Sequence, residues 1–123
     1  MQSQCHFRPE LSIQICGSKP FLGAESVALF KQINAFSSVR KACEKCGISY
    51  SKGWSIIHEC EETLGYSVVK RCQGGKDGGK SYLTEHGEKI IELYERFLHE
   101  MDEVCVQKYN EIFHNGEWLK NAE

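Results

Sequence analysis

The sequence predicts a winged helix-turn-helix domain, which is mainly α-helical with a small β-hairpin wing and a long C-terminal dimerisation helix. Three observations predict this fold. The 123 residues suffice for one hydrophobic core but not for two independent domains. Segments of helical periodicity follow one another, with a glycine turn before the third. Two short apolar segments then flank a glycine-rich loop, and a long amphipathic segment follows.

The first element is a predicted half-buried strand from Glu10 to Cys16, where apolar and polar residues alternate. Residues 17–20 (GSKP) have the composition of a turn. From Gly23 the spacing becomes helical, with an apolar stripe that ends before Ser37 and Ser38. These serines are expected to break this helix and to cap the next one. The stripe consists of Val27, Leu29, Phe30, Ile33 and Phe36.

The second helix is predicted over Val39–Cys46 and ends at Gly47. Ser49 is placed to cap a third helix that runs to about Leu64 and is closed by Gly65. A glycine inside a helix costs about 1 kcal/mol relative to alanine, so a close approach of the two helices is the expected compensation. The residues expected at that contact are Ala42, Cys43 and Gly53, and Trp54, Ile57 and Leu64 are expected to anchor the third helix in the core.

The wing is predicted as a strand over residues 66–71, a loop over residues 74–80 and a return strand over residues 81–83. Thr84 is then expected to cap a helix that reaches Tyr109 or beyond. Residues 1–123 are thus interpreted as a single domain, with the core and wing at about 10–83 and the C-terminal helix at about 84–113.

The C-terminal helix carries two apolar stripes, which is more than one small domain needs to cover. A partner helix is the natural contact for the excess, so the sequence predicts a homodimer. The alternative is that the whole apolar surface of this helix packs against the core of its own chain. The first stripe, which is the predicted dimer interface, consists of Ile90, Tyr94, Phe97, Met101 and Val104; the second consists of Ile91, Leu98, Cys105 and Ile112.

The net charge of −2 conceals an asymmetry along the chain. Residues 38–80 carry eight basic and five acidic side chains, whereas residues 81–123 carry four basic and ten acidic ones. A basic middle and an acidic tail are expected if the middle contacts phosphates and the tail contacts protein or water.

The predicted recognition element is the N-terminal turn of the third helix, because in a helix-turn-helix this turn reaches base edges in the major groove. Its candidate residues are Ser49, Ser51, Lys52 and Ser55. The alternative is that Ser49 is only a helix cap and Lys52 only a solvated charge.

The glycine-rich loop is the second candidate DNA contact, because glycines allow close backbone approach and the flanking cations suit phosphates. A nucleotide-binding loop is excluded by the spacing, since no Gly-Lys-Ser/Thr ending and no immediate helix follow. A flexible hairpin tip is the alternative interpretation. The residues concerned are Lys70, Arg71, Gly74, Gly75, Lys76, Gly78, Gly79 and Lys80.

The seven cysteines are odd in number and no leader pattern precedes them, which predicts reduced thiols and a cytoplasmic protein. Cys43 and Cys46 form a CxxC without a second pair, so they are interpreted as structural; a redox or metal switch that also involves Cys60 or Cys72 is the alternative. The five histidines have no catalytic companions. We therefore expect no enzyme activity, no cofactor, no metal site and no membrane span.

The stretch from Ser38 to Tyr94 resembles the N-terminal DNA-binding domain of molybdate-responsive ModE-type transcription regulators. The double-glycine wing followed by Leu83, Thr84 and Gly87 is the most specific part. The helix-turn-helix is also similar to that of LysR-type regulators, although less distinctively. The matching positions are Ala42, Gly47, Ile48, Ser49, Tyr50, Trp54, Ile57, Val69, Arg71, Gly74, Gly75, Gly78, Gly79, Leu83, Thr84, Gly87, Leu93 and Tyr94.

This resemblance implies a regulator that binds operator DNA as a dimer. The first and last helices would carry the contacts between the two subunits. The implied DNA contacts are Ser49, Tyr50, Ser51, Lys52 and Ser55 in the third helix, with Arg71, Lys76 and Lys80 in the wing. Full-length family members carry C-terminal molybdate-binding domains, whereas about 30 residues follow Tyr94 here, so no oxyanion site carries over.

The sequence thus predicts a sequence-specific transcription regulator that binds duplex DNA as a homodimer, with the recognition helix in the major groove and the wing on the backbone. A thiol- or metal-responsive regulator is one alternative. A protein-interaction adaptor that keeps the fold without binding DNA is another. The sequence does not identify an effector.

Overall fold

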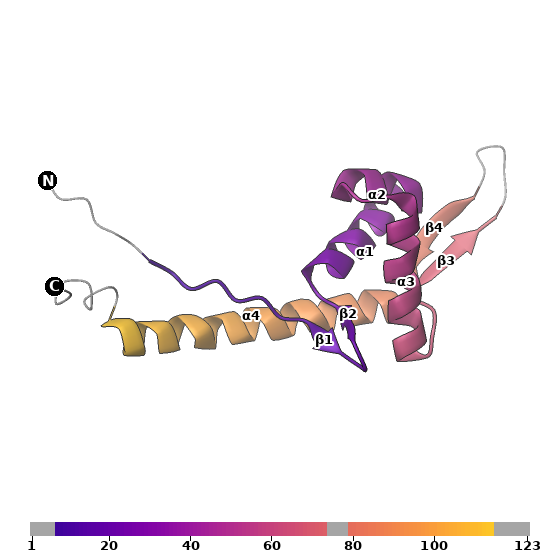
Figure 1. Ribbon diagram of the computed structural model, residues 1–123. Helices are drawn as coiled ribbons and strands as arrows, with labels where there is room; N and C mark the ends of the chain where they lie inside the picture. Colours follow the sequence, from indigo (N-terminus) through magenta and orange to yellow (C-terminus); the bar gives the residue numbers. More distant parts are fainter. Residues whose placement is uncertain (1–6, 74–78, 115–123) are drawn as a thin grey trace, which may run out of the picture. The chain divides into compact units, whose positions relative to one another are not determined.

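The computed structural model describes residues 7–73 and 79–114. It is mainly helical and contains the predicted helix-turn-helix, β-hairpin wing and long C-terminal helix, so the fold class is confirmed (Figure 1). The chain divides into two compact units, one formed by Ile13–Tyr94 and the other by the residues before and after it. The first unit contains all the candidate DNA-binding residues.

The predicted N-terminal strand is shorter than expected. Of the predicted residues only Ile15–Cys16 form a strand, β1, which pairs antiparallel with β2 (Pro20–Leu22). Because β2 has three residues, it pairs with no more than the end of the predicted strand. Pro20 belongs to β2 and not to the turn, which covers residues 17–19.

The three helices of the helix-turn-helix core begin and end where the sequence predicts: α1 (Ala24–Phe36), α2 (Val39–Cys46) and α3 (Tyr50–Leu64). The Ser38 hydroxyl accepts a hydrogen bond from the Lys41 amide, and the Ser49 hydroxyl accepts one from the Lys52 amide, each at 3.0 Å. Gly47 ends α2 with a φ of 72°, a left-handed conformation that glycine adopts without strain.

The contact between α2 and α3 confirms the predicted close approach of Cys43 and Gly53. A Cβ atom built on Gly53 would collide with the sulfur of Cys43, so only glycine allows this approach. Ile57 is fully buried beside them, as expected. Trp54 and Leu64 were expected in the core but are only half-buried, and their prediction as core anchors is wrong. Both lie at the edges of the buried face of α3. The residues with no exposed surface are Leu29, Phe30, Ile33, Ala42, Ile57, Cys60 and Val68.

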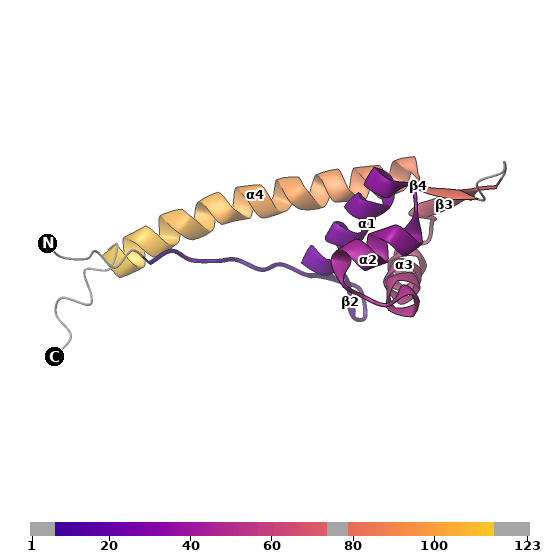
Figure 2. The ribbon, with the colours of Figure 1, turned by 90° about the horizontal axis from the view of Figure 1, so that it is seen from above.

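The wing is an antiparallel hairpin of β3 (Val69–Cys72) and β4 (Lys80–Leu83), as predicted (Figure 2). β3 begins at residue 69 and not at 66, and Lys80 belongs to β4 and not to the loop. The Glu61 carboxylate accepts hydrogen bonds from the amides of Val68 (2.8 Å) and Val69 (3.1 Å). β4 is held against the end of α1 by a backbone hydrogen bond from the Ser81 amide to the Ser37 carbonyl at 3.0 Å.

The last helix, α4 (Glu85–Phe113), begins after Thr84, whose hydroxyl accepts a hydrogen bond from the Gly87 amide at 3.0 Å. This confirms Thr84 as its cap. The first turns of α4 pack on the core, and the Tyr94 hydroxyl donates a hydrogen bond to the Ile13 carbonyl at 2.7 Å. Within the described ranges, no helix is both long and apolar enough to cross a membrane.

Candidate nucleic-acid interface

The predicted residues of α3 are exposed, but they do not share one face. Tyr50, Ser51, Lys52 and Ser55 all lie at the surface. Each helical residue advances by about 100°, so residues two apart lie on nearly opposite sides. Tyr50 is on the side of α3 that faces the wing, whereas Lys52 is on the side that faces β2. The Ser49 hydroxyl is occupied as the helix cap.

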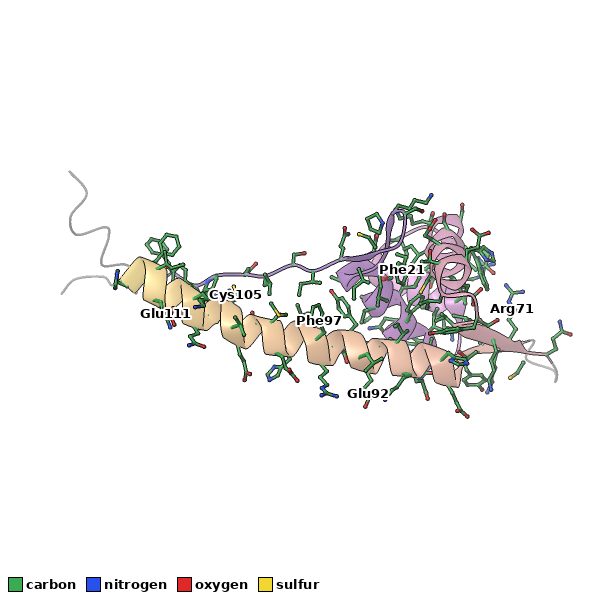
Figure 3. The ribbon with its side chains drawn as sticks, turned by 90° about the horizontal axis from the view of Figure 1, so that it is seen from below. Phe21, Arg71, Glu92, Phe97, Cys105 and Glu111 are labelled. Atoms are coloured by element: carbon green, nitrogen blue, oxygen red, sulfur yellow. The ribbon has the colours of Figure 1, made fainter. Side chains whose placement is uncertain are left out.

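The wing reaches α3 through Arg71, which projects from β3 (Figure 3). Its guanidinium carbon lies 4.6 Å from the centroid of the Trp54 ring. The same guanidinium donates a hydrogen bond to the Tyr50 hydroxyl at 3.4 Å. The structure therefore brings one predicted wing cation to the N-terminal half of the predicted recognition helix.

Arg40 is a cation at this surface that the sequence analysis missed. It projects from α2, and its guanidinium carbon lies 4.4 Å from the centroid of the Tyr50 ring. Tyr50 and Trp54 in turn contact each other edge to face, with 6.3 Å between ring centroids. We call these four residues, Arg40, Tyr50, Trp54 and Arg71, the cation–aromatic cluster. Helical periodicity places Arg40 on the exposed side of α2 but does not show that it meets an aromatic ring of the next helix.

A cleft of about 470 Å³ lies next to this cluster. It is bordered by the start of α2, by the N-terminal end of α3 and by both strands of the wing. The other predicted wing residues are placed as follows. Lys70, Gly79 and Lys80 are exposed, whereas Gly74, Gly75, Lys76 and Gly78 lie outside the described residues.

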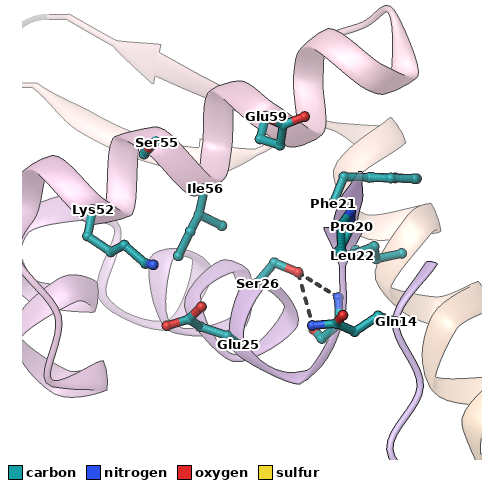
Figure 4. A pocket seen from close by; sticks show the side chains of 11 residues that line it. Gln14, Pro20, Phe21, Leu22, Glu25, Ser26, Lys52, Ser55, Ile56 and Glu59 are labelled. Carbon is teal, nitrogen blue, oxygen red and sulfur yellow. Dashed lines mark hydrogen bonds between the residues drawn. The ribbon is translucent and has the colours of Figure 1, made fainter. Parts of the chain in front are cut away.

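Lys52 lies at a different cleft, between α3 and the hairpin β1–β2, with a volume of about 250 Å³ (Figure 4). Its side chain points into this cleft, which Glu25 and Glu59 also line. Glu59 is already paired with Lys19 at 3.3 Å. Lys52 thus shares its cleft with two carboxylates and lies on another side of α3 than Tyr50.

The buried thiols are held in their protonated form. Burial, with the neighbouring Glu61 carboxylate as a smaller cause, raises the pKa of Cys60 to about 11. Burial, and then the nearby Cys46, also raises the pKa of Cys43. A neutral thiol is a poor nucleophile and a poor metal ligand. Among the side chains that the structure describes, no group of three or more metal-ligating residues is found.

The residues of the predicted dimer interface divide into two groups. Tyr94 is buried in the first unit, and Ile90 is half-buried. Phe97, Met101 and Val104 lie in the second unit, and between 37% and 47% of each residue's surface is exposed. The second group forms an exposed apolar stripe of α4.

The fold and this surface define a class: a winged helix-turn-helix protein whose wing and recognition helix meet in a cationic and aromatic cluster. No protein-family model matches the chain. It is 36% identical over 75 residues to the transcriptional regulator ModE of Yersinia pestis, which is 61% of this chain and 28% of that protein. It is 34% identical over 77 residues to the DNA-binding transcriptional dual regulator ModE of Escherichia coli K12, which is 63% of this chain and 29% of that protein.

A third relative is the molybdenum-pterin-binding protein MopB of Rhodobacter capsulatus, which is 38% identical over 73 residues, or 59% of this chain and 27% of that protein. The resemblance to ModE-type regulators is therefore confirmed over about three fifths of the chain. The aligned stretches span less than a third of the length of these relatives.

Proposed function

We propose that this chain binds duplex DNA sequence-specifically and regulates transcription, and that it acts as a homodimer. The observation that carries the proposal is the contact of Arg71 with Tyr50 and Trp54, which joins the wing and the N-terminal half of α3 into one surface. The names of two relatives, a transcriptional regulator and a DNA-binding transcriptional dual regulator, support the same conclusion. The proposal is of a binding protein and not of an enzyme.

In this proposal the exposed side chains of α3 read the major groove. Ser51 and Ser55 are exposed and four residues apart, which places them on one side of α3, and their hydroxyls suit base edges or phosphates. Arg71, Lys76 and Lys80 of the wing contact the flanking backbone. Lys52 reaches DNA only if it leaves the cleft that it shares with Glu25, so its contribution is expected to be smaller than that of Arg71.

The dimer would be formed by the apolar stripe of α4. Phe97, Met101 and Val104 repeat at spacings of four and three residues, which places them on one side of a helix. A twofold dimer repeats the same patch on both subunits and predicts an operator with two related half-sites.

The proposed function is tested by binding to DNA fragments selected from the host genome and to a pool of random duplexes. A regulator is expected to prefer its selected fragment by about a thousandfold or more. Replacing Ser51 and Ser55 with alanine should reduce this preference. Replacing Lys76 and Lys80 with alanine should weaken binding to both probes and reduce the salt slope by about 0.9 for each lost phosphate contact. Equal affinity for both probes, or no binding at low salt, would refute the proposal.

A further inference from the structure

The cleft beside the cation–aromatic cluster has walls from parts of the chain that are distant in the sequence. Ser38 and Arg40 come from the start of α2, Tyr50 from the start of α3, and Arg71, Gly79 and Ser81 from the wing. The backbone hydrogen bond between the Ser81 amide and the Ser37 carbonyl fixes β4 at the beginning of α2. The two guanidinium groups therefore border one cleft whose walls are tied together.

Both guanidinium groups are held in place before any ligand binds. Arg40 lies over the Tyr50 ring, and Arg71 lies over the Trp54 ring while donating to the Tyr50 hydroxyl. Stacking of this kind restricts a side chain that is otherwise free to adopt many rotamers. A group that is fixed in advance loses less entropy when it binds.

The cleft is also free of opposing charge. Its lining includes no aspartate or glutamate. Among the described residues, no carboxylate forms an ion pair with Arg40 or Arg71. Two guanidinium groups without counter-ions at one polar cleft suit an anionic ligand. Their planar, forked donors match the oxygen atoms of a phosphate.

The same geometry disfavours an unpaired nucleobase as the occupant. Proteins that bind single strands stack bases on exposed aromatic faces. Here the guanidinium groups lie over the Tyr50 and Trp54 rings, on faces that a base would use. The two rings therefore stack against the arginines and are not available to stack against a base.

We infer that this cleft seats one phosphate of the DNA backbone, clamped between Arg40 of the helix-turn-helix and Arg71 of the wing. Tyr50 and Trp54 are positioning residues that hold the two guanidinium groups. The inference rests on the proposed function and deepens it, because it assigns Arg40, which lies outside both the recognition helix and the wing, to DNA binding. The clamp would fix the angle between wing and recognition helix on the duplex.

The test compares Arg40→Gln, Arg71→Gln and the double variant by fluorescence anisotropy on a labelled 30-base-pair duplex selected from the genome. Each single variant should weaken binding about tenfold, as expected for the loss of a charged hydrogen bond. Because both arginines hold the same phosphate, the double variant should lower the salt slope by about 0.9, the value for one phosphate. Lys41→Gln and Lys45→Gln are the matched controls, since these exposed cations of α2 do not line the cleft.

The positioning role is tested by variants that keep or remove a ring. Tyr50 is exposed, so its replacement does not threaten the core. Tyr50→Phe keeps the ring under Arg40 and should retain most of the affinity, whereas Tyr50→Leu should bind as weakly as Arg40→Gln. In the Arg40→Gln background Tyr50→Leu should bind as well as Tyr50→Phe, because both variants remove the hydroxyl that Arg71 uses and only the ring under Arg40 differs between them. Weaker binding of Tyr50→Leu than of Tyr50→Phe in that background would overturn the positioning role.

The source of the phosphate is tested by the fluorescence of Trp54 in a Trp118→Phe background, which leaves Trp54 as the sole tryptophan. A change on addition of the duplex, abolished by Arg71→Gln, supports a backbone phosphate. A change with inorganic phosphate alone at submillimolar concentration would assign the cleft to a free anion and overturn the inference.

A wild-type chain that binds no duplex refutes the proposed function as well. A wild-type chain that binds normally, with arginine variants that match the lysine controls, refutes only the clamp.

Discussion

The contact between Gly53 and Cys43 determines how closely α2 and α3 approach. A Cβ atom at position 53 would overlap the sulfur of Cys43. Cys43 is only 2% exposed, so its side chain has no free space into which it could move. Gly53→Ala therefore forces either the sulfur or the two helices to shift, and we expect it to destabilise the fold.

The size of the effect follows from two opposing contributions. Alanine is favoured over glycine inside a helix by about 1 kcal/mol. Overpacking a buried contact costs about 1–3 kcal/mol. The net loss for Gly53→Ala is thus about 1 kcal/mol, which corresponds to a melting temperature lower by about 4–8 °C in a domain of this size.

Cys43→Ala removes the sulfur atom that a Cβ at position 53 would overlap. It should therefore reverse the sign of the effect of Gly53→Ala on the free energy of unfolding. Without the sulfur, the nearest atoms to a Cβ at position 53 are the Cβ of residue 43 at 3.8 Å and the Cδ1 of Ile48 at 3.9 Å, which are ordinary contacts. In this background Gly53→Ala should stabilise the chain by up to about 1 kcal/mol. Urea denaturation of the four proteins measures both effects and their coupling. Equal destabilisation in the two backgrounds would refute the steric explanation.

Three further predictions follow from the fold. Gly87→Ala should cost about 2–3 kcal/mol in the same assay, because its Cβ would meet the backbone carbonyl of Val68, which no side-chain substitution removes. The pKa of Cys60 is raised from 9.0 to about 11 in the folded chain, so the stability that its protonated thiol contributes should be present below pH 9 and lost as the pH rises toward 11. Urea titrations at each pH measure this loss, and a Cys60→Ala variant should lack it. Met101→Glu should yield monomers in light scattering, and a dimer that persists would place the interface away from the α4 stripe.

The helix boundaries were predictable because their signals are local. Ser38 and Ser49 cap the helices that follow them, and Gly47 and Gly65 end the helices that precede them. Each of these residues acts on atoms a few positions away. The first strand was predicted less well, since a strand depends on a partner and β2 is only three residues long.

The interface was predicted less completely, because it depends on contacts between elements. The periodicity of α3 placed Trp54 with the core residues, but the arrival of Arg71 from the wing makes it part of a surface cluster. Lys52 was predicted with Ser51 and Ser55 as part of the recognition turn, yet it lies in the cleft that Glu25 also lines. Arg40 was not among the predicted DNA contacts, because nothing local indicates that it meets the Tyr50 ring.

The residues that carry the family resemblance divide into two kinds once the structure is known. Gly47, Thr84 and Gly87 satisfy local demands of the backbone: a left-handed turn, a helix cap and a close approach to a carbonyl group. Any protein with this fold needs such residues, so they indicate structure and not function. Tyr50, Trp54 and Arg71 are different, because each lies at least partly at the surface and they contact one another.

Core packing does not require such a cluster. Tyr50 and Arg71 are exposed, and the fully buried residues of α3 are Ile57 and Cys60. A cationic and aromatic group at the surface, formed by residues from separate elements, is explained more directly by a ligand than by stability. Under the proposed function, substitutions at Tyr50, Trp54 and Arg71 should affect DNA binding more than the free energy of unfolding, whereas substitutions at Thr84 or Gly87 should do the reverse.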